Sequence, residues 1–235
     1  MVDMKRAYVA AVRAVTRKAP FEKLTVWSDD NRRRTWLVSL LAIHDFDRMR
    51  ALGWPWWTFD AAQQVSEHLE SVGGARVFEW GSGASTLWLA ERATEVHSVE
   101  HDPQWAAQVQ AAAPDHVVVA TVPPTRPPTG HVVVGSRKRG FEGLDFTEYC
   151  AAIDAVPGDF DLIVIDGRAR EACLRAAITR LTPGGVIVFD NVDRERYVAA
   201  IDTLGDPVRV TMTRGLTPAL PYPTRTALIS TSHTP

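Results

Sequence analysis

The chain has 235 residues, of which 46% are hydrophobic and 23% are charged, and its formal net charge is −2. This length suits one sizeable core, and the charge balance argues against a general nucleic-acid binder, which usually carries a basic excess. The sequence has no apolar run of the roughly 18–20 residues needed to span a membrane, and no signal-peptide pattern, so we expect a cytoplasmic protein.

The first part of the sequence predicts helices, which we interpret as an N-terminal extension or lid over residues 1–55. Residues 4–18 have an amphipathic pattern with a basic face, and residues 34–52 have a second helical pattern that Gly53 and Pro55 end. A third helix is expected over about residues 60–71. The apolar N-terminal helices could also pair two copies of the chain into a homo-oligomer.

From residue 75 onward, short apolar runs alternate with helical segments, and this alternation predicts a doubly wound, Rossmann-like α/β sheet. Continuous apolar runs such as residues 162–165 are typical of parallel strands buried on both faces. The expected strands are 76–80, 95–100, 116–121, 161–166, 185–190, 208–213 and 224–231, and the expected helices are 84–93, 103–112, 145–155, 169–181 and 194–204.

Two segments depart from this alternation. Residues 122–144 contain four prolines and predict a loop or small hairpin inserted into a main domain that spans residues 56–235. Only the proline-rich link 214–223 joins the last two expected strands, so we expect these strands to be antiparallel.

A glycine-rich turn follows the first expected strand, where glycines let the backbone approach a ligand closely. Glu100 ends the next expected strand, where a carboxylate can accept hydrogen bonds from ribose hydroxyls. Thr86 stands where a dinucleotide fingerprint has its third glycine. A nearby acid, Glu79, would repel a pyrophosphate but suits a cationic ligand. The turn reads Glu79-Trp80-Gly81-Ser82-Gly83-Ala84-Ser85-Thr86.

Four segments resemble motifs of class I S-adenosylmethionine (SAM)-dependent methyltransferases, in the right order, within about residues 56–231. They are residues 79–83, 99–102, 160–167 and 181–191. The resemblance implies a seven-stranded sheet of order 3-2-1-4-5-7-6 with strand 7 antiparallel, and SAM as the cofactor. It also implies that Glu79 and Gly81 face the methionine portion, Glu100 the ribose and His101 the adenine. Further expected cofactor-binding residues are Ser82, Gly83, Ser85, Thr86 and Asp166, although Ser85 and Thr86 could instead cap the following helix.

Three side chains that follow two neighbouring strands form the candidate catalytic group: Asp166, Asp190 and Asn191. Their oxygen atoms suit Mg²⁺ or a similar divalent cation. The set resembles the metal site of catechol-type O-methyltransferases, which implies that the metal would hold a substrate oxygen and lower its pKa. The alternative is that Asp190 fixes a loop, Asn191 caps a helix, and Asp166 binds backbone amides or acts as a general base.

The acceptor is expected to be a small molecule, methylated on oxygen or, as the alternative, on nitrogen. Trp56 and Trp57 are expected to line its pocket, or else to pack in the core. Arg168 and Arg170 could clamp a carboxylate or phosphate of the substrate, or form internal salt bridges. The basic run 137–139 is either a solvated surface or a lid over an anionic substrate. Two other functions stay open: an NAD(P)-linked oxidoreductase on a related fold, and a SAM-fold binding protein without catalysis.

Overall fold

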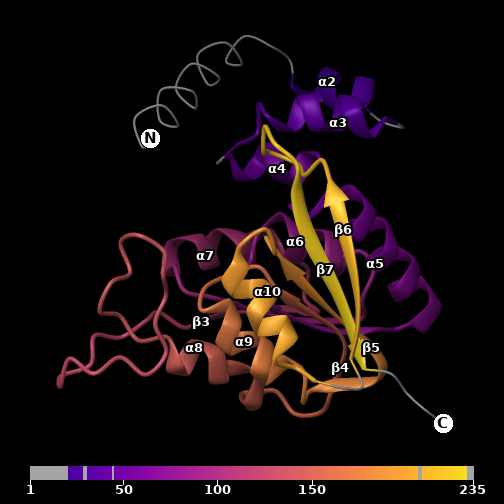
Figure 1. The fold of residues 1–235 in the computed structure, drawn as a ribbon. Helices are drawn as coiled ribbons and strands as arrows, with labels where there is room; N and C mark the ends of the chain where they lie inside the picture. The colour runs from indigo at the N-terminus through magenta and orange to yellow at the C-terminus, as the bar shows by residue number, and fades with distance from the viewer. Residues whose placement is uncertain (1–20, 29–30, 44, 206–207, 232–235) are drawn as a thin grey trace.

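The structure is a computed structural model that describes residues 21–28, 31–43, 45–205 and 208–231, and it places helices on both faces of one sheet (Figure 1). The strands are β1 (Arg76–Trp80), β2 (Glu95–Glu100), β3 (Val117–Thr121), β4 (Phe160–Ile165), β5 (Leu181–Asp190), β6 (Val208–Gly215) and β7 (Thr224–Thr231). The helices are α2 (Phe21–Ser28), α3 (Arg32–Ser39), α4 (Phe46–Ala51), α5 (Phe59–Val72), α6 (Ala84–Ala90), α7 (Pro103–Ala112), α8 (Thr147–Ala151), the short 3₁₀ helix η1 (Ala152–Ala155), α9 (Arg170–Ala177) and α10 (Glu195–Asp202).

The sheet has the predicted order β3-β2-β1-β4-β5-β7-β6. The strands from β1 to β5 pair in parallel, whereas β7 is antiparallel to both β5 and β6. The predicted fold class is therefore confirmed. The parallel strands end at one edge of the sheet, which is where ligands bind in open α/β folds.

Alternation along the central strands builds two apolar cores. Phe78 and Ile163 face one core, which α8, α9 and α10 cover, and Val77 and Leu162 face the other, which α5 and α6 cover. All four of these strand residues are fully buried. This double coverage explains why β4 is apolar from Leu162 to Ile165 without interruption.

The prediction of one helix over residues 34–52 is wrong, because α3 and α4 are separate. α3 ends at Ser39, and α4 has its own cap: the Asp45 carboxylate accepts a hydrogen bond from the backbone N–H of Arg48 at 3.2 Å. The helix expected over residues 4–18 lies outside the described residues. A small apolar cluster that includes Met49 and Ala84 packs the N-terminal helices against the start of α6.

Residues 122–144, which we term the inserted loop, contain no helix or strand and project beside α8 (Figure 1). One isolated bridge, between Thr125 and Asp145, closes its base. The hydrogen bond from the Thr147 side chain, together with those from the backbone N–H groups of Thr147 and Val133, lowers the pKa of the Asp145 carboxyl to about 2. Across the described ranges, no helix combines the length and apolar character that a bilayer crossing requires.

Candidate active site at the carboxyl edge of the sheet

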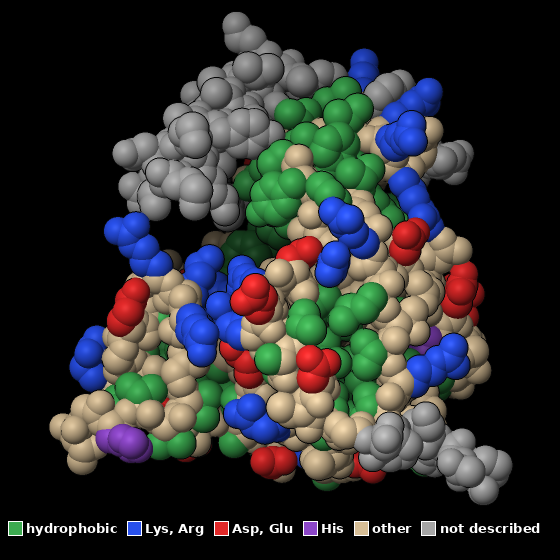
Figure 2. Space-filling model, in the orientation of Figure 1, with side chains coloured by type: hydrophobic (Ala, Val, Ile, Leu, Met, Phe, Trp, Pro, Cys, Tyr) green, Lys and Arg blue, Asp and Glu red, His purple; other side chains and the backbone are tan. Residues whose placement is uncertain are grey.

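A cavity of about 470 Å³ opens where β1, β2 and β4 end. Segments far apart in the sequence form its wall: the glycine-rich turn, the end of β2, the end of β4, the N-terminal extension and the inserted loop. Figure 2 shows a hollow on this side of the molecule, below apolar side chains of the N-terminal region. The lining residues are Met49, Trp56, Gly81, Ser82, Gly83, Ala84, Ser85, Glu100, His101, Asp102, Trp105, Phe141, Asp166, Gly167 and Arg168.

Gly81 shapes the turn because no side chain fits at its position. Its φ is +101°, and an added Cβ would lie 2.6 Å from the Cα of Gly167. Gly167 is equally restricted, since a Cβ there would meet the hydroxyl of the buried Tyr149. The ends of β1 and β4 therefore approach each other through two glycines, and the backbone of the turn faces the cavity.

Glu100 is fixed at the cavity wall by the backbone around it. One carboxylate oxygen accepts hydrogen bonds from the N–H groups of His101 (2.7 Å) and Asp102 (3.0 Å), and the other accepts from the N–H of Ser82 (3.1 Å). The His101 ring lies 5.2 Å from the ring of Phe141, which the inserted loop contributes. The carboxylate thus lies between the glycine-rich turn and a pair of aromatic rings.

Glu79 lies behind the cavity wall and is fully buried. Its carboxylate accepts hydrogen bonds from three hydroxyls: Ser85, Thr86 (2.5 Å) and Ser98 (2.7 Å). Burial outweighs these bonds and raises its pKa to about 7. Thr86 also accepts a hydrogen bond from the N–H of Gly83, so it caps α6 as the alternative interpretation expected. Glu79 therefore holds the turn from beneath, and a ligand in the cavity would meet Ser85 and the turn backbone first.

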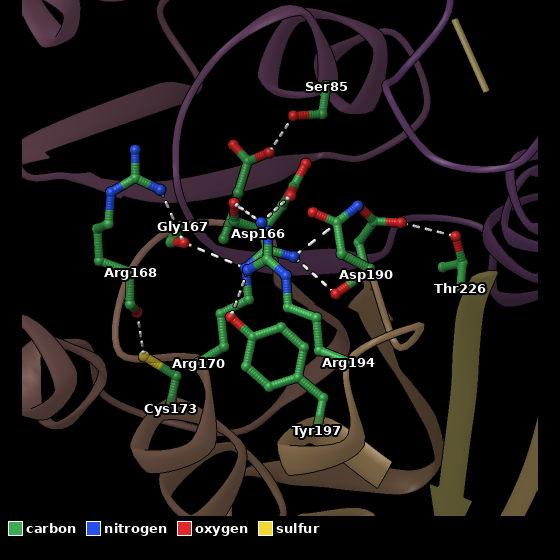
Figure 3. A network of polar contacts seen from close by, with 12 residues as sticks. Ser85, Asp166, Gly167, Arg168, Arg170, Cys173, Asp190, Arg194, Tyr197 and Thr226 are labelled. Carbon is green, nitrogen blue, oxygen red and sulfur yellow. Dashed lines mark hydrogen bonds and ion pairs between the residues drawn. The ribbon is translucent and has the colours of Figure 1, made fainter. Parts of the chain in front are cut away.

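A buried arginine lies between the two candidate catalytic aspartates (Figure 3). Arg170 donates to the Asp166 carboxylate and to the backbone carbonyls of Asp166 and Asp190, each at 2.6 Å, and to the carbonyl of Gly167 at 3.1 Å. Its nearest approach to the Asp190 carboxylate is 3.8 Å. Arg170 therefore forms the internal salt bridge that was the alternative to substrate binding.

Burial raises the pKa of both carboxyl groups in this network. The pKa of Asp190 rises to about 7, through burial and the neighbouring charge of Asp166, although Arg170 opposes the shift. The pKa of Asp166 also rises through burial, and both Arg170 and Arg168 oppose the rise. Of the two carboxyl groups, only that of Asp166 lines the cavity.

The expected Mg²⁺ site does not fit this arrangement. Asp190 accepts a hydrogen bond from Thr226 at 2.7 Å with one carboxylate oxygen, and its other oxygen contacts the amide of Asn191. The guanidinium of Arg170 occupies the position between the two acids, where a cation would have to lie. Among the described residues, no group of three or more His, Cys, Asp or Glu side chains could hold a metal ion. The predicted metal set Asp166, Asp190 and Asn191 is thus not supported.

The two candidate tryptophans have different environments in the structure. Trp56 lines the cavity, whereas Trp57 is fully buried and packs edge-on against Trp88 at 5.9 Å. Three cavity residues lie outside the motifs from which the site was predicted: Met49, Trp105 and Phe141. Apolar periodicity marks the first two only as packing residues, and no local signal in the inserted loop identifies Phe141 as a cavity residue.

The central part of the chain matches a known protein family. The family model described as a methyltransferase domain matches residues 78–192. A comparison with curated proteins found no match.

Solved structures share the fold at low sequence identity. A putative O-methyltransferase from Klebsiella pneumoniae is 15% identical, with a TM-score of 0.56 and coverage of 98% of this chain and 100% of that one. An O-methyltransferase from Bacillus cereus, in complex with SAH (S-adenosylhomocysteine, the demethylated form of SAM), is 18% identical, with a TM-score of 0.55. The match covers 97% of this chain and 99% of that one. The O-methyltransferase TomG from Streptomyces achromogenes, in complex with SAM, is 16% identical, with a TM-score of 0.52 and coverage of 73% and 81%.

The sheet order and the cavity at its carboxyl edge define a methyltransferase-type Rossmann-like domain. The match of the methyltransferase-domain model to residues 78–192 agrees with this fold and identifies a methyltransferase domain in the chain. The predicted family and enzyme class are confirmed, and the dinucleotide oxidoreductase alternative finds no support.

Proposed function

We propose that the cavity binds SAM and that the protein methylates an oxygen atom of a small-molecule acceptor. The observation that carries the proposal is that Glu100 and Asp166, from the ends of β2 and β4, line the same cavity. The choice of oxygen draws on the solved structures described as O-methyltransferases.

The lining residues fit the chemistry of a sulfonium nucleoside. The Glu100 carboxylate offers acceptor oxygens for ribose hydroxyls, and the rings of His101 and Phe141 offer flat apolar surfaces for a base. The turn backbone and Ser85 would hold the amino-acid end. Glu79 contributes indirectly, because its three hydroxyl partners fix the turn on which that end would rest.

SAM supplies the methyl group when it is bound. The protein's part is to hold the acceptor hydroxyl beside Asp166 and to take up its proton. Burial favours the neutral acid, whereas the charges of Arg170 and Arg168 favour the carboxylate. Burial thus raises the proton affinity of Asp166 while the arginines favour its carboxylate form, and a general base needs both properties. The proton passes from the hydroxyl oxygen to a carboxylate oxygen of Asp166.

The test is a turnover assay with SAM and a panel of small hydroxylated and aminated acceptors, read by mass spectrometry and by formation of SAH. We expect SAH to form together with a product that carries the methyl group on oxygen. Methylation confined to nitrogen would contradict the choice of acceptor atom. Absence of SAM binding would contradict the proposed function as a whole.

A further inference from the structure

A second, smaller cavity of about 100 Å³ adjoins the first and shares Gly167 and Arg168 with it. Six of its lining residues are basic and one, Glu171, is acidic. Figure 2 shows Lys and Arg side chains gathered on this face, between α10 and the inserted loop. The basic residues, which we term the arginine pocket, are Arg137, Lys138, Arg168, Arg170, Arg194 and Arg196.

The carboxylates of the protein do not neutralise this pocket. Arg170 is paired with Asp166 and approaches Asp190, and Arg196 pairs with Glu171 at 3.1 Å. Arg168 and Arg194 have no carboxylate within 4.0 Å anywhere in the part of the chain that the structure describes. Two cationic groups at one small cavity therefore have no carboxylate in direct contact, and the acids Glu100 and Asp166 act on Arg168 only from beyond that distance.

The guanidinium groups are held in place by other contacts. The Tyr197 hydroxyl accepts hydrogen bonds from both Arg194 and Arg196 at 3.2 Å, and the guanidinium carbons lie 5.5 and 4.6 Å from the centre of its ring. Arg168 lies 5.4 Å from the ring centre of Phe141 and donates to the carbonyl of Gly167 at 3.3 Å. Fixed guanidinium groups need less reorganisation to bind an oxyanion bidentately.

We propose that the arginine pocket binds an oxyanion, a carboxylate or phosphate group, on the methyl acceptor. This inference rests on the proposed function and extends it to the substrate class. Arg168 lines both cavities, so an acceptor anchored there by its anionic group can extend past Gly167 into the larger cavity, beside Asp166. Two charged contacts at one end would then orient the hydroxyl at the other.

The test uses the full chain saturated with SAH, titrated by isothermal calorimetry with three probes of one size class: benzoate, phenyl phosphate and benzamide. We expect one or both oxyanions to bind and neutral benzamide to bind at least about tenfold more weakly. A preference between benzoate and phenyl phosphate identifies the oxyanion. The oxyanion affinity should also fall with added salt, because a charge–charge contact is screened.

Substitutions of single arginines test whether oxyanion binding depends on the arginine pocket or on the general positive charge of the surface. Arg168→Gln and Arg194→Gln should each weaken oxyanion binding about tenfold or more. The matched control Arg175→Gln, on an exposed residue of α9 that lines neither cavity, should leave it unchanged. Arg194 is exposed, so its variant keeps the test valid if Arg168→Gln fails to fold.

Two results would overturn the inference: equal affinity for benzoate, phenyl phosphate and benzamide, or full oxyanion affinity in Arg194→Gln. Titration of the same samples with SAH distinguishes failure of the arginine pocket from failure of the proposed function. If SAH binds and the oxyanions do not, the arginine pocket is refuted while the proposed function stands. If SAH itself does not bind, the proposed function fails.

Discussion

Glu79 should make the stability of the protein depend on pH in a way that one substitution removes. Its pKa is raised from 4.5 to about 7 by complete burial. Between these values the folded protein holds a proton that the unfolded chain has released, so the unfolding free energy falls as the pH rises. The difference corresponds to about 3 kcal/mol, which is fully present below about pH 4.5 and lost as the pH passes about 7.

Replacing Glu79 with Gln removes the ionisable group and keeps the size and polarity of the side chain. Urea unfolding at about pH 5 and about pH 8 should show that the wild type loses up to about 3 kcal/mol more than Glu79→Gln. The control Glu148→Gln, an exposed acid on α8, should behave like the wild type. Asp190 also has a raised pKa, but its contribution is shared by all three proteins. Parallel pH profiles for the wild type and Glu79→Gln would refute the reasoning.

Three further substitutions test the turn and the buried network. Gly81 has a φ of +101°, and the Cβ that Gly81→Ala adds would lie 2.6 Å from Gly167. This substitution should lower the unfolding free energy by at least about 1 kcal/mol in urea titrations. Unchanged stability would contradict the close approach of β1 and β4. Arg170→Met should cost about 3–5 kcal/mol in the same measurement, because it leaves the buried Asp166 and Asp190 without their cation; a neutral effect would show that the ion pair is dispensable. Asp166→Asn should reduce kcat by about 10²–10⁴-fold in an SAH-release assay while calorimetry shows little change in SAH affinity, and an unchanged kcat would exclude Asp166 as the base.

Periodic features of the sequence predicted the fold well. The apolar run of β4 reflects burial of that strand on both faces of the sheet. The link between β6 and β7 is too short for a crossover helix, and this requires an antiparallel pair. The division between α3 and α4 was missed because the helical apolar pattern continues through residues 40–45. The cap that Asp45 provides is a single hydrogen bond that periodicity does not reveal.

The site was predicted less completely, since side-chain pairing depends on contacts distant in sequence. The ends of β1, β2 and β4 did place Gly81, Glu100 and Asp166 at one cavity. The sequence left two roles open for Arg170, and only the packing of α9 against the ends of β4 and β5 shows it between two acids. Phe141 reaches the cavity from an irregular loop, for which neither periodicity nor a motif gives a signal.

The most direct test of the central claim is calorimetric titration of SAH into the wild type, Glu100→Gln and the control Glu91→Gln, whose side chain is 72% exposed. The wild type and the control should bind SAH equally, and Glu100→Gln should bind about 10–150-fold more weakly, as expected for the loss of one hydrogen bond to a charged group. Failure of the wild type to bind SAH at millimolar concentration, or undiminished binding by Glu100→Gln, would contradict the assignment of this cavity.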